Sequence, residues 1–148
     1  MIIEDSFVVD APVDRVWTLL KDIPRVTGCI PGAEITEIVD AKTYRAKVSV
    51  KAGPVKVDYN ATVVVDSLDE VDHRATFTVK GDEMRGRGGV TAQVVSEVLA
   101  REGSAYVTLR ADAKISGLVA TVGGRLIEGV AKRTIATFAA NLNGLLVV

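Results

Sequence analysis

Residues 43–65 read TYRAKVSVKAGPVKVDYNATVVV and contain two runs in which apolar and polar side chains alternate. Strict alternation places successive side chains on opposite faces of a β-strand, so each run predicts a strand with one buried face. The runs 43–51 and 55–67 are separated by Ala52-Gly53-Pro54, a short connection with turn-forming residues. This stretch therefore predicts a long antiparallel hairpin.

The alternation extends on both sides of this hairpin, between residues 33 and 117. Because the connections are short, strands that follow one another in the chain are expected to pair. The sequence thus predicts a curved, seven-stranded antiparallel sheet. Its other strands are expected near residues 2–9, 33–40, 73–81, 86–99 and 104–116.

Two short helices are predicted after the first strand, and a long one near the C-terminus. Asp10 can cap the first helix, and Pro12 suits its first turn. Residues 23–32 contain two prolines and two glycines, which predict a second short helix and a loop. From residue 118 to about 145 the period is again 3.6, which predicts one long helix. The buried stripe of the first helix consists of Val13, Val16, Trp17 and Leu20.

This order of elements predicts an α+β fold in which a curved sheet wraps the long C-terminal helix. With 148 residues, of which 48% are apolar and 25% are charged, we expect a single domain over residues 1–148. Eighteen basic and nineteen acidic residues give a net charge of −1, which argues against a nucleic-acid partner.

Cysteine and histidine each occur once, as Cys29 and His73. Two such side chains are too few for a transition-metal site, and one cysteine cannot form an internal disulfide. Met1 is not followed by a secretory signal. We therefore expect a cytoplasmic protein with no metal ion and no covalent cofactor.

An apolar cavity is expected between the sheet and the long helix. Aromatic residues make up only 5% of the chain, and alanine and valine occupy the middle of several predicted strands. Side chains this small leave unfilled space unless the helix sits closer to the sheet, which is the alternative. The predicted lining consists of Trp17, Ile30, Tyr44, Val48, Tyr59, Ala61, Phe77, Met84, Ala92, Val94, Leu109, Ala111, Ile127, Phe138 and Leu142.

For some of these side chains the sequence allows two roles. Tyr44 and Tyr59 each combine an apolar ring with one hydroxyl, which would hold a ligand carbonyl or else bond a backbone group. Trp17 would stack on a planar ligand or belong to the core. Cys29 and Ile30, in a loop bounded by proline and glycine, form a candidate gate, with Cys29 as a small buried hydrophobe the alternative.

The charged motifs have simple explanations. Asp69-Glu70-Val71-Asp72-His73 resembles a cluster of metal ligands, but it falls in a predicted hairpin turn where solvated charges are expected. Arg85-Gly-Arg-Gly lacks the strand, loop and helix context of a phosphate-binding loop and predicts a glycine-bulged strand. Arg85 and Arg87 would lie near the cavity mouth and contact anionic lipid or a partner protein, or else be ordinary surface cations.

The last fifteen residues, 134–148, carry no charge. We expect 134–142 to pack as the end of the long helix. We expect 144–148 to be exposed and to serve association with a membrane or a second protein.

Several motifs together resemble the G-subunit family of carbon monoxide dehydrogenase. The chain opens with F-x-V-x-A-P-x-x-x-V-W-x-L-L-x-D at residues 7–22 and continues with Cys-Ile-Pro-Gly at 29–32. The Gly53-Pro54 turn, Arg85-Gly-Arg-Gly and the closing I-S-G-L-V-A-T-V-G-G-R-L-I at 115–127 complete the pattern. The resemblance covers essentially the whole chain. That family belongs to the START-like, Bet v 1-like (SRPBCC) superfamily of helix-grip proteins.

The resemblance implies a non-catalytic binding protein whose cavity holds a lipophilic small molecule. The implied ligand is a quinone, menaquinone or ubiquinone, which the protein would deliver to carbon monoxide dehydrogenase as an electron acceptor. The resemblance also implies peripheral recruitment of that enzyme to the cytoplasmic face of the membrane.

Two alternatives stay open. START-like relatives include cyclases and hydrolases, but the inward positions offer tyrosines without a histidine or carboxylate partner for acid–base work. The other alternative is a structural assembly factor that binds no ligand.

Overall fold

Within residues 1–146, seven strands form one antiparallel sheet in the order β1-β7-β6-β5-β4-β3-β2. The computed structural model describes residues 1–146. The strands from β2 to β7 pair with their neighbours in the chain, as their short connections predict, and β1 pairs with β7. The strands are β1 Ile2–Val9, β2 Ala33–Ile38, β3 Thr43–Ala52, β4 Val55–Asp69, β5 Arg74–Glu83, β6 Gly89–Arg101 and β7 Ser104–Ile115. The predicted seven-stranded antiparallel sheet is confirmed.

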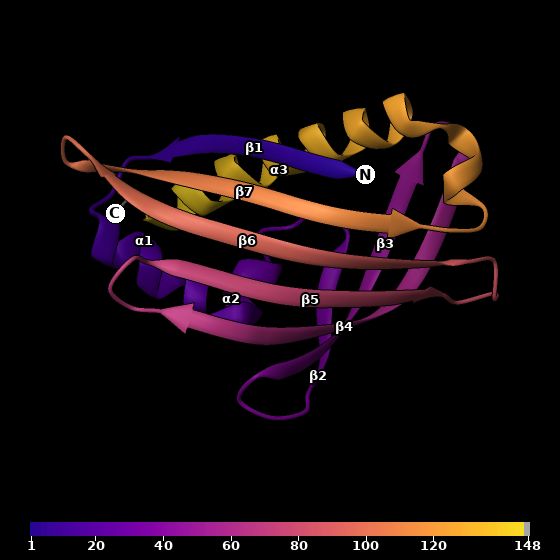
Figure 1. Cartoon of the computed structure of the whole chain (residues 1–148), viewed down its shortest axis with the longest axis horizontal. Helices are drawn as coiled ribbons and strands as arrows, with labels where there is room; N and C mark the ends of the chain where they lie inside the picture. The colour runs from indigo at the N-terminus through magenta and orange to yellow at the C-terminus, as the bar shows by residue number, and fades with distance from the viewer. Residues whose placement is uncertain (147–148) are drawn as a thin grey trace.

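The sheet is strongly curved. In Figure 1 the strands β1, β7, β6 and β5 run across the molecule, while β3 crosses behind them at a steep angle. A register shift in β4 between Val65 and Ser67, and another in β2 between Ile35 and Glu37, mark irregularities of the kind that bend strands. The concave face therefore encloses the helices.

Two short helices follow β1, as predicted: α1 spans Val13–Lys21 and α2 spans Ile23–Thr27. Pro12 occupies the position before α1, where its missing N–H costs no hydrogen bond. Asp22 separates the two helices, and its carboxylate accepts a hydrogen bond of 3.3 Å from the backbone N–H of Arg25. The same aspartate thus ends α1 and caps α2.

The long helix begins later than predicted. Residues Val119–Val122 form a 3₁₀ turn, η1, and α3 runs over Gly124–Leu146. Between them Gly123 has a φ of 92°, a left-handed conformation that interrupts the helix and that glycine adopts without strain. The prediction of one helix from residue 118 is therefore wrong at its start.

The end of α3 also differs from the prediction for 144–148. Leu146 is buried, because it lies four residues after Leu142 on the same stripe of the helix. Its carbonyl accepts a hydrogen bond of 3.1 Å from Arg15 Nη2 in α1. Only Gly144 and Leu145 of that segment are exposed, and residues 147–148 lie outside the described part of the chain.

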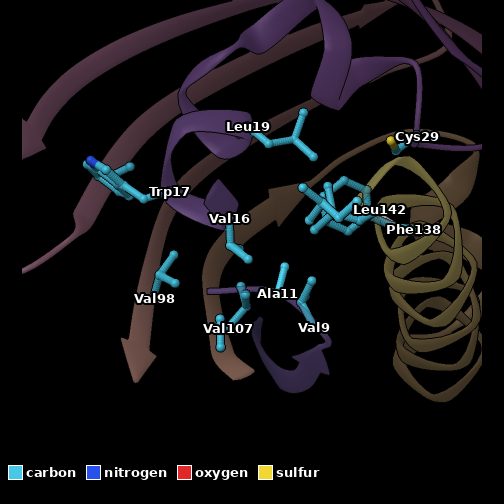
Figure 2. Packing of buried hydrophobic residues seen from close by; sticks show 13 residues of the cluster. Val9, Ala11, Val16, Trp17, Leu19, Cys29, Val98, Val107, Phe138 and Leu142 are labelled. Carbon is cyan, nitrogen blue, oxygen red and sulfur yellow. The ribbon is translucent and has the colours of Figure 1, made fainter. Parts of the chain in front are cut away.

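Apolar side chains gather in two clusters. The larger one joins α1, α3 and the adjoining ends of β1 and β7, and Figure 2 shows Val9, Val16 and Val107 close together within it. The second cluster contains Val57, Tyr59 and Val119, packed against the first residues of α3 through Ile127. The two ends of the molecule are therefore filled by the protein's own side chains.

The Arg85-Gly-Arg-Gly segment is a turn between β5 and β6, since β6 begins only at Gly89. The prediction of a strand from residue 86 is wrong here because the Glu83 carboxylate stabilises a tight turn of the following residues. It accepts backbone hydrogen bonds of 3.1 Å from Arg85 and from Arg87. Two backbone segments approach closely at this turn: Gly88 lies directly against Gly117, and both have positive φ.

Candidate functional site

A cavity of about 290 Å³ opens between the sheet, the two short helices and α3. Its wall is almost entirely apolar. Strands β4 to β7 form its floor, α1 and α2 with the following loop form one side, and α3 forms another. The lining consists of Trp17, Leu20, Ile23, Val26, Thr27, Ile30, Val63, Ala75, Phe77, Val79, Val94, Ser96, Val107, Leu109, Thr134, Ile135 and Phe138.

Local sequence patterns place these groups. Ile23, Val26 and Ile30 recur at spacings of three and four, so α2 and its loop turn one apolar face toward the sheet. In the sheet, Phe77 pairs with Val94, and strand alternation directs both side chains inward. Phe138 of α3 meets Phe7 edge-on, with ring centroids 5.9 Å apart, which fixes one side of the wall.

Three hydroxyl groups interrupt the apolar lining. Thr27 Oγ1 donates a hydrogen bond of 2.7 Å to the Ile23 carbonyl, and Thr134 Oγ1 donates one of 2.8 Å to the Val130 carbonyl. Ser96, on β6, is buried, and its Oγ has no hydrogen-bond partner within residues 1–146. The cavity therefore combines an apolar wall with one uncommitted polar group.

Ionisable groups do not line the cavity in the part of the chain that the structure describes. A charged cluster adjoins Trp17, whose Nε1 donates a hydrogen bond of 2.6 Å to Glu70. Lys21 Nζ lies 3.0 Å from the same carboxylate. The indole N–H first, and the ammonium group second, hold the pKa of Glu70 below its usual range.

Trp17 is thus a fixed part of the wall. Its ring centroid lies 5.3 Å from that of His73, and in Figure 2 its nitrogen points away from the neighbouring Val16 and Leu19. The indole N–H is committed to Glu70 in the β4–β5 turn, so only the ring can contact a bound molecule. The predicted Asp69–His73 cluster forms this turn, with the Asp69 carboxylate accepting hydrogen bonds from the backbone N–H of Val71 and Asp72.

The loop after α2 is held to the long helix. Asn141 Nδ2 donates a hydrogen bond of 2.9 Å to the Cys29 carbonyl. Cys29 itself is buried, and burial raises the pKa of its thiol. Ile30 next to it lines the cavity, so the loop forms part of the wall.

The structure brings together six of the fifteen side chains predicted for the lining: Trp17, Ile30, Phe77, Val94, Leu109 and Phe138. The other nine lie outside it. They are Tyr44, Val48, Tyr59, Ala61, Met84, Ala92, Ala111, Ile127 and Leu142.

The positions of the nine follow from packing. Tyr59, Val48 and Ile127 belong to the second apolar cluster, where Gly81 lies against the Tyr59 ring. Leu142 is fully buried in the larger cluster. Ala61, Ala92 and Ala111 face inward by their register in the sheet without lining the cavity.

The two remaining side chains lie near chain turns. Tyr44 Oη donates a hydrogen bond of 3.3 Å to the Ala41 carbonyl, the backbone alternative considered for it. Met84 is half exposed in the turn after β5.

The predicted lining omitted eleven of the seventeen described side chains that line the cavity, among them all three from α2 and the hydroxyl of Ser96. The spacing of Ile23, Val26 and Ile30 was a usable signal for the former. Val94, which pairs with Phe77, faces inward. Ser96 lies two residues further along β6, so strand alternation places its side chain on the same inward face of the sheet.

Comparisons with known proteins agree with this geometry. A family model that describes the G-subunit of carbon monoxide dehydrogenase (CoxG) matches residues 6–146. The chain belongs to this family. A comparison of the CoxG-family chain with curated proteins finds no match.

Solved structures share the fold. A conserved protein from Geobacillus kaustophilus is 25% identical, with a TM-score of 0.87 over 99% of this chain and 95% of that one. The Zhui aromatase/cyclase from Streptomyces sp. R1128 is 14% identical, with a TM-score of 0.70 over 99% and 93% of the two chains. A START superfamily protein from Mycobacterium smegmatis is 12% identical, with a TM-score of 0.61 over 98% and 96%. The CoxG-family chain therefore has a START/Bet v 1-like fold.

Two further properties of residues 1–146 concern membrane spans and metal sites. Neither α3 nor any shorter helix in this range is long and apolar enough to cross a bilayer. Within the same range, histidine, cysteine and carboxylate side chains do not gather in threes where they could hold a metal ion.

Proposed function

We propose that this chain binds a neutral lipophilic small molecule in the cavity between its sheet and helices, and that the ligand is a quinone, menaquinone or ubiquinone. The observation that carries the proposal is the apolar, uncharged lining of the cavity. Sites for small molecules are typically concave and apolar, with few polar groups that fix orientation. Membership of the CoxG family supports the choice of a quinone, because quinones accept the electrons that a dehydrogenase releases.

The size of the cavity limits how much of the ligand it holds. Its volume of about 290 Å³ is roughly twice that of an engineered cavity of about 150 Å³ that binds benzene. A fused pair of rings, or one ring with a short substituent, therefore fits inside. The isoprenoid chain of a respiratory quinone would extend through the opening.

Burial of the ring, rather than of the chain, would determine binding. Transfer of an isoprenoid chain out of water is favourable by about 25 cal/mol of free energy per Å² of buried surface. The bilayer, however, offers the chain a comparable apolar environment. Extraction from a membrane therefore requires contacts with the ring that the bilayer does not provide. The aromatic wall of Trp17, Phe77 and Phe138 supplies ring contacts of that kind.

In this proposal the protein serves carbon monoxide dehydrogenase as a carrier on the cytoplasmic membrane face. The enzyme converts CO and water to CO₂, two protons and two electrons. A quinone that takes up two electrons and two protons becomes the quinol. This chain would hold the ring, exclude water and present it. Peripheral contact with the membrane, and recruitment of the enzyme to it, belong to the same proposal.

The cavity favours neither of the two alternatives, a START-like enzyme or a structural assembly factor that binds no ligand. General acid–base catalysis requires an ionisable side chain within reach of the substrate, and the described lining contains none. A purely structural assembly factor has no need of an unfilled apolar volume, which weakens packing.

Extraction with organic solvent followed by mass spectrometry tests the proposal. We expect purified protein to release a quinone, or to take one up when it is incubated with menaquinone in vesicles. The matched variants are Val94→Phe and Val95→Phe. Val94 lines the cavity, whereas its neighbour Val95 faces the other side of the same strand, between Thr76 and Arg110.

V94F places a ring in the cavity, and we expect it to lose at least nine-tenths of quinone uptake. Because the ring enters unfilled space, it should cost less than the roughly 1–3 kcal/mol typical of overpacking. V95F should take up quinone as the wild type does. Absence of quinone from the wild type after incubation, or equal uptake by both variants, would refute the proposed site.

A further inference from the structure

The Ser96 hydroxyl is an exception in a well-satisfied structure. Ser96 lies within β6, opposite Ala75 of β5 and Leu109 of β7, and all three residues line the cavity. The residue is 7% exposed, and its Oγ is almost completely covered and makes no hydrogen bond to any described residue. Buried hydroxyls in proteins almost always have a partner, so a buried one without a partner requires an explanation.

The other hydroxyls of the lining differ from Ser96 in one respect. Thr27 and Thr134 both donate their protons to helix carbonyls, at 2.7 Å and 2.8 Å. Such a threonine retains only its capacity to accept. The N–H of Trp17 is likewise committed, to Glu70. Among the side chains that line the cavity, Ser96 therefore holds the donor that no described protein group uses.

The lining also restricts the charge of what it can hold. No lining side chain in the described chain is ionisable, so a carboxylate or ammonium group placed there would lose its hydration without gaining a counter-ion. The group that meets Ser96 must therefore be neutral and must accept a hydrogen bond.

We infer that the Ser96 hydroxyl rotates about its Cα–Cβ bond toward a bound molecule and donates a hydrogen bond to an acceptor oxygen of the ligand, and that this bond makes the cavity selective for neutral apolar molecules that carry a ring carbonyl. The inference rests on the proposed function, because it assigns the polar contact within the same cavity. It places the carbonyl end of the ring on the β5–β6–β7 floor. Ser96 is thus a specificity-determining residue.

The test uses two probes that differ only in the ring oxygens. They are 2,3-dimethyl-1,4-naphthoquinone, whose substituted ring does not readily add the Cys29 thiol, and 2,3-dimethylnaphthalene. Equilibrium dialysis measures the Kd of each probe for the wild type, for Ser96→Ala and for Thr134→Val. T134V is the matched control, because it removes a lining hydroxyl whose proton is already committed.

We expect S96A to weaken binding of the quinone about threefold to tenfold, as the loss of one hydrogen bond predicts, and to leave binding of the hydrocarbon unchanged or stronger. T134V should change the ratio of the two Kd values little. S96A should melt no lower than the wild type, since it removes a buried hydroxyl that lacks a partner.

The outcomes separate the two proposals. Equal loss or no loss for both probes in S96A overturns the assignment of Ser96 while apolar binding stands. Failure of the wild type to bind either probe refutes the proposed function, and the inference falls with it.

Discussion

At the scale of single residues, Glu83 is a buried side chain outside the cavity whose carboxylate has several hydrogen-bond partners. It is buried beside Tyr59, and its carboxylate accepts hydrogen bonds from Arg87 Nε at 2.8 Å and from two backbone N–H groups of the β5–β6 turn. These bonds, the Arg87 guanidinium first, lower the pKa of Glu83 from 4.5 to about 2. One carboxylate therefore organises the whole turn.

This pKa predicts how stability depends on pH. In the unfolded chain Glu83 takes up a proton near pH 4.5, whereas in the folded chain it does so only near pH 2. The stabilisation is thus complete above about pH 5 and is lost progressively as the pH falls to 2. We expect Glu83→Gln to melt at a lower temperature than the wild type at pH 7, and the difference to shrink as the pH approaches 2.

Thermal melting of both proteins between pH 7 and pH 2 checks this prediction. Glu34→Gln serves as the control, because Glu34 is exposed in β2 and makes no ion pair with a described residue. A constant difference between wild type and E83Q over the whole range would mean that the carboxylate does not titrate with a lowered pKa.

Among the elements, α3 packs against β1, β3 and η1. It begins beside Met1 and ends against the C-terminal end of β1, where Asn143 Nδ2 donates to the Val8 carbonyl and Asn143 Oδ1 accepts from the N–H of Asp10. Its first residues belong to the second apolar cluster, and Leu142 lies fully buried in the larger one. The helix therefore links both ends of the core.

We predict that Leu142→Ala destabilises the protein by about 2–5 kcal/mol, the usual range for a leucine deleted from a close-packed core. The control is Leu145→Ala on the same helix, whose side chain is exposed and whose removal should change stability by about 0.5 kcal/mol or less. Urea unfolding followed by circular dichroism measures both. Similar losses in the two variants would contradict the burial pattern of α3.

Element boundaries were less predictable than the elements themselves. Alternation in 43–65 and beyond predicts every strand, because each has one buried face. It could not predict the break at Gly123, since glycine is compatible with both a continued helix and a left-handed turn. Nor could it predict the turn at 84–88, which depends on the Glu83 carboxylate reaching amides across the turn.

At the scale of the whole molecule, the cavity lies where the helices leave space rather than where the sheet is lined by alanine. Among the described residues, Ala75 is the one alanine in its lining. Near the η1 end, Tyr59, Val119 and Ile127 fill the concave face instead. The sequence could indicate an apolar interior with small side chains, but the location of the unfilled volume depends on the approach of α2 and η1, which strand periodicity does not encode.

The same packing explains why only some of the predicted side chains line the cavity. Side chains on β5 and β6 that face α2, such as Phe77 and Val94, line the cavity. Inward side chains nearer η1, such as Tyr59, do not. Both groups alternate identically in sequence, so only the three-dimensional arrangement separates them.

Isoleucine residues occur both in the cavity lining and in the second apolar cluster, so their methyl groups allow the most direct test of the binding site. Ile23, Ile30 and Ile135 line the cavity, whereas Ile115 and Ile127 belong to the second cluster. Protein labelled at the isoleucine δ1 methyls would be titrated with 2,3-dimethyl-1,4-naphthoquinone and followed by NMR. We predict saturable shifts at the first three methyls and small ones at the other two. Shifts concentrated at Ile115 and Ile127, or no saturable shift at any methyl, would contradict the binding of a ring in this cavity.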